Sequence, residues 1–294
     1  MAAILATGIA TLDIINTVVQ YPAEDSETRA VSQTKARGGN ATNTLVVLSQ
    51  LGHLCHWAGI LINEPDGHLI CDDLDHYAID HSACRLFNQG KVPTSYITRN
   101  QQTASRTIVH YRDCPEYSFD DFKNIDLNKF DWLHFEGRNV DETRRMMLYA
   151  ADHYPMIPRS LEIEKARDGI DVLFDLASVL FFSKDYALSH GFDSAVSLLK
   201  QITKKRPYNA SCTWGKQGAW AITKTADIYH SQAETTAPVI DTLAAGDTFN
   251  AAMINSLLNG QTMDRALTQA CQLASYKCQY QGLENLITGF NTYR

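Results

Sequence analysis

Residues 241–250, DTLAAGDTFN, combine two carboxylates with a tripeptide that has almost no side chain. The tripeptide consists of Ala244, Ala245 and Gly246. Asp247 follows it and opens a run with apolar residues at helical spacing. A bare turn at a helix N-terminus leaves backbone N–H groups open to an anion such as a phosphate. An aspartate beside that anion could take a proton from an attacking hydroxyl, although a simple helix N-cap is the alternative for Asp247 taken alone.

A second group of polar residues lies near the start of the chain. Asp13 ends a predicted strand, and 38-GGNATN-43 opens a predicted helix. Asn40 and Asn43 are three residues apart, so a helix projects them to the same side. One carboxylate and two amides supply the acceptors and donors that several hydroxyl groups require. A turn-forming role for Asp13 and an N-cap role for Asn40 are the alternatives.

The elements that would position these residues alternate between strand and helix. Strands are predicted at 4–17 and 55–62, helices at 38–52 and 66–79, and strand–helix units follow from residue 129. Two long helices, about 246–259 and 263–279, finish the chain. This order predicts an α/β fold with a parallel sheet covered on both faces. Ligands bind at the carboxyl edge of such a sheet. The residues that follow predicted strands should gather there: Asp13, Gly38, Gly39, Asn40, Glu136, Glu164, Lys184, Gly215 and the loop 241–247.

Two stretches do not fit this rhythm. Residues 27–36 alternate weakly, and 93–100 with 105–113 have the pattern of a half-exposed hairpin. We expect them to form a small sheet over the site, a lid built from about 13–37 and 93–113. The lid is then inserted within a single domain that spans 1–294.

Composition excludes several classes of function. A formal net charge of −7 argues against a general nucleic-acid binder. The seven cysteines are scattered, and none has C-x-x-C spacing, which favours a cytoplasmic protein over a disulfide-stapled or zinc-bound one. No run of apolar residues predicts a membrane span or a signal peptide. The segment 214-WGKQGAW-220 lacks the glycine spacing and the Ser or Thr of a P-loop.

The two motifs together resemble the signatures of the ribokinase-like (PfkB) carbohydrate kinases. GGNATN precedes a helix, and DTLAAGDTFNAA follows about 200 residues later, so the resemblance covers the whole chain. Other segments resemble the branch of the family that phosphorylates the 1-hydroxyl of fructose, among them 37-RGGNATN-43, 133-LHFEGRN-139, 160-SLEIEK-165 and 271-CQLASYKCQYQG-282. The resemblance implies a Rossmann-type αβα sandwich with a β-lid. It also implies ATP, Mg²⁺ and K⁺ as cofactors, transfer of the γ-phosphate to a sugar, and a homodimer formed through the lids.

The resemblance also implies a role for individual residues. Asp247 matches the catalytic base, and the 244–246 backbone matches the anion hole. The positions implied on the sugar side are Asp13, Gly39, Asn40, Asn43, Arg106, Glu136 and, from a partner subunit, Asp25. Those implied on the nucleotide side are Lys184, Gly215, Gly218, Cys271 and Cys278. Asp241 matches an alkali-cation ligand, and Glu164 would bind Mg²⁺ through water.

One departure and two alternatives stay open. The family usually has Gly where this chain has Ala244, and we expect that alanine to occupy an ordinary turn with negative φ. The acceptor could be another molecule, such as ribose, a 2-keto-3-deoxy acid or a nucleoside. A sugar-binding sensor with weak or lost catalysis is the other alternative.

Overall fold

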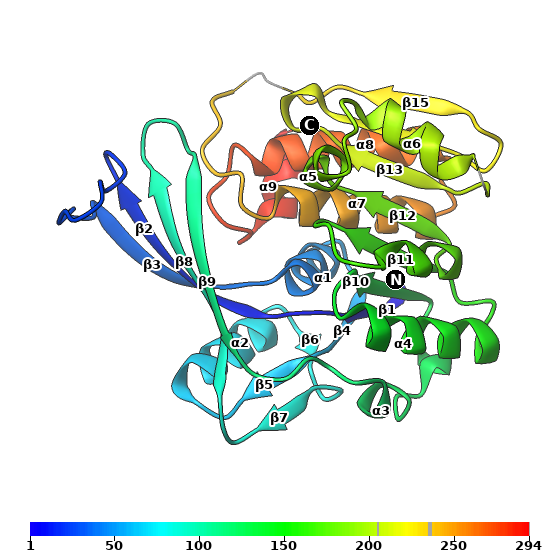
Figure 1. Ribbon diagram of the computed structural model, residues 1–294, viewed down its shortest axis with the longest axis horizontal. Helices are drawn as coiled ribbons and strands as arrows, with labels where there is room; N and C mark the ends of the chain where they lie inside the picture. Colours follow the sequence, from blue (N-terminus) through cyan, green and yellow to red (C-terminus); the bar gives the residue numbers. More distant parts are fainter. Residues whose placement is uncertain (205, 235–236, 294) are drawn as a thin grey trace.

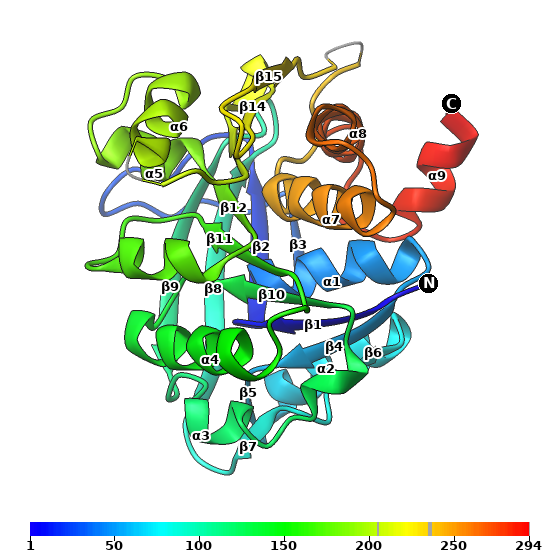
Figure 2. The ribbon, with the colours of Figure 1, turned by 90° about the vertical axis from the view of Figure 1, so that its right-hand side faces the viewer.

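The chain folds around a nine-stranded sheet with helices on both faces (Figures 1 and 2). The computed structural model describes residues 1–204, 206–234 and 237–293. In sheet order the strands are β15 (Ile228–Ser231), β14 (Ala219–Ile222), β13 (Ala210–Thr213), β12 (Val179–Phe182), β11 (Arg159–Ile163), β10 (Trp132–Glu136), β1 (Ala3–Thr7), β4 (Leu54–Ala58) and β6 (Ile79–Asp80). From β13 to β6 the strands run parallel, and β14 and β15 are antiparallel. Every residue of β10 and β12 is buried, as expected when helices cover both faces.

The helices form two layers. One layer contains α1 (Asn40–Gln50), α7 (Ala245–Leu258), α8 (Met263–Lys277) and α9 (Leu286–Tyr293), which pack against one another. The opposite layer contains α3 (Phe119–Phe122), α4 (Val140–His153), α5 (Lys184–Ser189), α6 (Ala195–Thr203) and the 3₁₀ turn η2 (Ile170–Leu176). Two further 3₁₀ turns are η1 (Leu127–Lys129) and η3 (Gly215–Gln217), and α2 (Pro65–His76) packs against β6 and the small sheet. No helix in the described ranges is long and apolar enough to cross a membrane.

A separate four-stranded sheet stands beside the large one (Figure 1). Its order is β3 (Ser32–Gly38), β2 (Thr11–Val18), β8 (Lys91–Asn100) and β9 (Arg106–Asp113). These strands come from the two segments in which the sequence predicts a lid, and β8 and β9 form the expected antiparallel hairpin. A short parallel pair, β5 (Ile60–Ile62) and β7 (Arg85–Phe87), lies at its base.

The prediction of one strand over residues 4–17 is wrong. The chain leaves the large sheet after β1 and enters the small sheet at β2, with Gly8 at the junction. A Cβ at Gly8 would lie 2.5 Å from a carboxylate oxygen of Glu136 and 2.7 Å from the Cβ of Ala41, so only glycine fits there. The predicted strand 55–62 also divides, between β4 and β5. Both halves of each run are apolar, so hydrophobic pattern alone did not reveal the change of sheet.

Candidate active site

A cavity of about 680 Å³ lies at the carboxyl edge of the large sheet and is walled by the small sheet. Most residues that the sequence predicts for the site line it. They are Asp13, Gly39, Asn40, Asn43, Arg106, Glu136, Glu164, Lys184, Gly215, Ala244, Ala245, Gly246 and Asp247. They come from β2, the start of α1, β9, β10, the strand ends after β11 to β13, and the start of α7. The parallel strands β10 to β13 all end at this edge and bring the residues that follow them together, while the small sheet adds Asp13 and Arg106.

Asp247 lies in the first turn of α7 with only 6% of its surface exposed. The amide nitrogen of Asn43 donates to its Oδ2 at 2.7 Å. Burial is the main cause that raises the pKa of Asp247 to about 8; the hydrogen bond from Asn43 opposes the rise, and the nearby carboxylates of Glu164 and Glu136 add to it. A carboxylate with a pKa in this range can accept a proton near neutral pH and is a suitable general base.

The turn before Asp247 differs from our expectation in one respect. Ala244 has φ 58° and ψ 13°, the left-handed conformation, so the predicted negative φ is wrong. The conformation is imposed by the turn that starts α7, in which Thr248 N–H and its hydroxyl both donate to the Ala244 carbonyl. Within the described chain, no side chain caps the N-terminus of α7. The first N–H groups of the helix therefore remain available to an anion in the cavity.

Two glycines make room for the polar groups on the small-sheet side. A Cβ at Gly38 would lie 2.2 Å from a carboxylate oxygen of Asp13. Gly39 has φ 103°, and a Cβ there would lie 2.2 Å from the carbonyl oxygen of Ile9. The Asp13 carboxylate accepts a hydrogen bond from the Thr11 hydroxyl at 2.7 Å, and burial raises the pKa of Asp13 despite that bond. The arrangement presents a carboxylate and the Asn40 amide to the same cavity.

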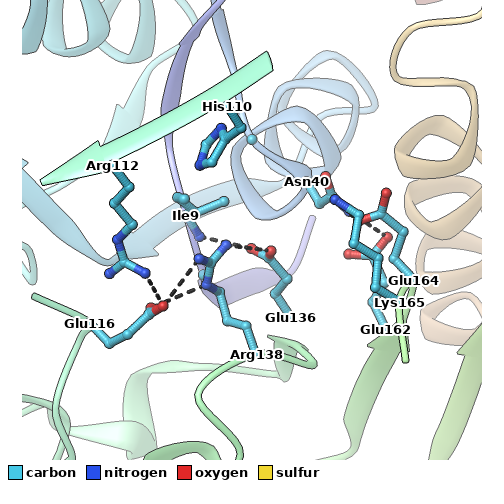
Figure 3. Close-up of polar contacts among 12 residues, drawn as sticks. Ile9, Asn40, His110, Arg112, Glu116, Glu136, Arg138, Glu162, Glu164 and Lys165 are labelled. Atoms are coloured by element: carbon cyan, nitrogen blue, oxygen red, sulfur yellow. Dashed lines mark hydrogen bonds and ion pairs between the residues drawn. The ribbon is translucent and has the colours of Figure 1, made fainter. Parts of the chain in front are cut away.

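Glu162 is a site residue that sequence analysis missed. The amide nitrogens of Asn40 and Asn250 donate to its Oε1 at 3.2 and 3.0 Å. Asn40 also donates to Glu164, and both glutamates lie beside it in Figure 3. Its Oε2 is buried and, in the part of the chain that the structure describes, has no hydrogen-bond partner. Burial, and then the charge of Asp247, raise the pKa of Glu162 well above its ordinary range. An acid in the buried strand 159-RSLEI-163 was the available signal, because such a position is unfavourable for a charge without a functional partner.

A network of alternating charges borders the other side of the cavity (Figure 3). Glu136 accepts hydrogen bonds from the Ile9 backbone N–H at 2.8 Å and from Arg138 at 3.0 Å. Glu116 pairs with both Arg138 and Arg112, which ties β9 of the small sheet to the large sheet. Glu136, which the sequence predicts to contact the sugar, therefore has hydrogen-bond partners within the protein. The sequence did not single out the two arginines, because Arg112 and Arg138 meet at the same carboxylate, Glu116, only in the fold.

A second cavity of about 480 Å³ lies on the far side of the 244–246 turn. Gly215, Gly218, Cys271 and Cys278, all predicted for the nucleotide side, line it. The two cavities share Thr213, Gly215, Thr242, Ala245 and Gly246. Lys184 lines the first cavity, with its ammonium 5.6 Å from the ring centre of Trp214. Arg106 donates to the Thr242 hydroxyl at 2.7 Å, so the small sheet reaches across to the turn.

Two predicted residues lie elsewhere. Asp25 is exposed in the loop between β2 and β3 and does not line the cavity of its own chain. Asp241 is buried outside both cavities, and the ammonium of Lys277 lies 2.8 Å from its Oδ2. Because a positive charge already occupies that carboxylate, Asp241 does not fit the alkali-cation role that the resemblance implies.

Comparison with known proteins defines the class. Residues 1–288 match the family described as pfkB family carbohydrate kinase. The chain belongs to this family, and its fold is the ribokinase-like α/β fold.

Particular relatives agree with this assignment. The chain is 39% identical to the ketohexokinase of Mus musculus over 97% of its own length and 98% of the mouse protein. Among solved structures it is similar to a putative ribokinase from Agrobacterium tumefaciens, with a TM-score of 0.86 and 19% identity over 99% of this chain and 98% of that one. A ribokinase from Cryptococcus neoformans in complex with ADP has a TM-score of 0.82 and 15% identity, with both chains fully covered.

Proposed function

We propose that this carbohydrate kinase transfers the γ-phosphate of ATP to the 1-hydroxyl of D-fructose. One observation carries the reaction type: a buried Asp247 and a bare helix N-terminus stand where a polar cavity meets a second, more apolar one. That arrangement suits a sugar on one side, a nucleotide on the other, and a phosphate at the turn between them. The choice of fructose rests on the 39% identity to mouse ketohexokinase.

In this proposal the protein mainly positions groups and neutralises charge, as phosphoryl transfer requires. Asp13 and Asn40 would bind sugar hydroxyls in the polar cavity. Asp247 would accept the proton of the reacting hydroxyl while the N–H groups of 244–246 bind the phosphate. The apolar cavity beside Cys271 and Cys278 would hold the nucleoside.

Mg²⁺ is part of the proposal. The residues fit it, because Glu162 and Glu164 present carboxylate oxygens beside the turn, and the Glu162 Oε2 lacks a protein partner in the described ranges. In those ranges no three His, Cys, Asp or Glu side chains are grouped to hold a metal directly. That suits an ion held mostly by water and substrate phosphates, with Glu164 reached through water. When bound, Mg²⁺ would neutralise charge on the phosphates.

We further propose a homodimer formed through the small sheet, in the cytoplasm. Tyr96, Val109 and Tyr111 are exposed, and Tyr96 and Val109 pair across β8 and β9. Such an apolar face suits contact with a second copy. All seven cysteines are free thiols, which is typical of a reducing compartment.

A substrate screen tests the proposal. ADP release would be measured with fructose, tagatose, ribose, adenosine and no acceptor, and the position of the phosphate would be found by ³¹P NMR. We expect the highest kcat/KM with fructose and phosphate on its 1-oxygen. A preference for ribose or adenosine would show that the acceptor is not fructose, although the reaction type would stand. Fructose binding without turnover would instead support a sugar-binding sensor that has lost catalysis.

A further inference from the structure

Lys277, the last residue of α8, has none of its surface exposed. Burying an ammonium is strongly unfavourable unless its charge is paired and its N–H groups all find acceptors. Three oxygens lie within reach of Nζ: Asp241 Oδ2 at 2.8 Å, the Asp241 carbonyl at 3.1 Å and the Tyr280 carbonyl at 3.3 Å. An ammonium has three donors, so the site satisfies each of them.

Both oxygens of the Asp241 carboxylate accept hydrogen bonds as well. Its Oδ1 accepts from the Leu243 backbone N–H at 2.9 Å, and its Oδ2 also accepts from Gly282 N–H at 3.1 Å. Burial alone would raise the pKa of Asp241, but Lys277 holds it below its ordinary value. Burial lowers the pKa of Lys277, and the Asp241 charge opposes that change. One carboxylate and two carbonyls therefore form an oxygen cage, and the cation inside it is the compact ammonium of Lys277.

This cage lies next to the 244–246 turn, which binds the phosphate in our proposal. Asp241 begins the segment that leads to Ala244, and its bond to Leu243 N–H fixes the residue before the left-handed position. Lys277 lines neither cavity, so it cannot touch a substrate there. Its influence must pass through Asp241, which makes it a positioning residue.

We infer that the Lys277 ammonium serves as a built-in monovalent cation that holds the 241–246 turn in its phosphate-binding shape, so that turnover needs no added K⁺. The inference rests on the proposed kinase activity. It also accounts for the misfit of Asp241 as an alkali-cation ligand, since a free cation would have to share the same oxygens with an ammonium.

The first experiment uses the unaltered protein. Turnover would be measured in tetramethylammonium chloride and in KCl, each at about 0.1 M to match ionic strength. We expect rates that differ by less than about twofold, a free-energy difference too small for a required ion. Strong activation by K⁺ in this protein would overturn the inference.

The second experiment removes the ammonium. Lys277→Ala leaves the oxygen cage with room for an ion, and the misplaced turn should lower kcat about 10²-fold in tetramethylammonium chloride. K⁺ or NH₄⁺ should restore much of that loss. Lys91→Ala is the control, because Lys91 pairs with Glu64 and Asp66 away from both cavities and its loss should not create a response to K⁺. Full activity of Lys277→Ala without K⁺ would overturn the inference.

A third readout does not depend on activity. The thermal midpoint of Lys277→Ala should rise in KCl relative to tetramethylammonium chloride, while that of the wild type and of Lys91→Ala should not. Rb⁺ should give an anomalous peak beside Asp241 in crystals of Lys277→Ala only. If no acceptor supports turnover, the proposed function fails, yet these two results still decide whether Lys277 replaces a cation. Equal thermal responses in all three proteins, or an Rb⁺ peak in the wild type, would contradict it.

Discussion

The amide nitrogen of Asn43 lies 2.7 Å from Oδ2 of Asp247, although 203 residues separate the two in the chain. This hydrogen bond joins the start of α1 to the start of α7, the two helices that the motifs open. It also lowers the pKa of Asp247, the base in our proposal, because a donor to the carboxylate stabilises the charged form. The two motifs therefore meet at one carboxylate.

The pH dependence of kcat/KM should report this tuning. With a pKa of about 8, Asp247 is largely protonated at low pH, so we expect kcat/KM for the sugar to rise as pH increases through that value. Asn43→Ala removes the donor and should move the rising limb to higher pH. A lower kcat/KM with an unmoved limb would show that Asn43 only binds the sugar.

Asp247→Asn keeps the shape of the side chain and removes the proton acceptor. We expect kcat to fall by about 10²–10⁴-fold with sugar affinity largely kept. Turnover within a factor of about two of the wild type would contradict the role of Asp247 as base.

The same variant should be the more stable protein at high pH. The pKa of Asp247 is raised from 3.8 to about 8 in the fold, so ionisation opposes folding increasingly as pH rises between these values. Asparagine carries no charge. The thermal midpoint of Asp247→Asn should therefore exceed that of the wild type at pH 8 to 9, and the difference should vanish below about pH 4. A constant difference at all pH values would contradict the shift.

Asp13→Ala tests the sugar side of the cavity. Losing a charged hydrogen-bond acceptor costs about 1.5–3 kcal/mol, so the sugar Kd should rise about tenfold or more while ATP binding changes little. Asp113→Ala is the matched control, since Asp113 is an exposed aspartate at the end of β9 that lines neither cavity. An unchanged sugar Kd, measured by calorimetry, would place Asp13 outside the binding site.

Much of the fold followed from the sequence because parallel strands leave a regular pattern. The helices observed at 40–50 and 65–76 lie close to the predicted 38–52 and 66–79, and the edge where the parallel strands end gathers most predicted site residues. The hydrophobic pattern did not show that the chain changes sheet between β1 and β2, because both strands are apolar on their buried sides.

The parts of the site that could not be predicted depend on partners distant in sequence. Lysine is a residue type that usually lies on the surface. Only the contact of Lys277 with Asp241, 36 positions away in the chain, explains why this lysine is buried. Glu162 could have been noticed as an acid in a buried strand, but its partners Asn40 and Asn250 approach it from distant parts of the chain and could not be predicted. Local propensity carries no information about such contacts.

The dimer that we propose through the small sheet makes a prediction about Asp25. This residue lies in the exposed β2–β3 loop and outside its own cavity, so it can serve a sugar only in a partner subunit. Asp25→Ala should raise the sugar KM without changing the thermal midpoint. Dilution of the wild type below the dimer dissociation constant should also raise its sugar KM. Sedimentation at assay concentration provides the check, because a fully active monomer would refute the shared site.

Ala244→Gly tests the left-handed residue that opens the 244–246 turn. Alanine at φ 58° is strained by about 1–2 kcal/mol, and glycine removes that strain while adding freedom to the unfolded chain. We expect the free energy of unfolding to stay the same or rise by up to about 1 kcal/mol, and kcat to stay the same or rise, because glycine keeps the N–H and widens the approach to it. Ala226 provides the control: it has φ 67° in the exposed turn between β14 and β15 and lines neither cavity. Ala226→Gly should give a similar change in unfolding free energy with unaltered kinetics. A loss of stability in Ala244→Gly, together with a gain in Ala226→Gly, would mean that the Cβ of Ala244 contributes packing that outweighs its strain.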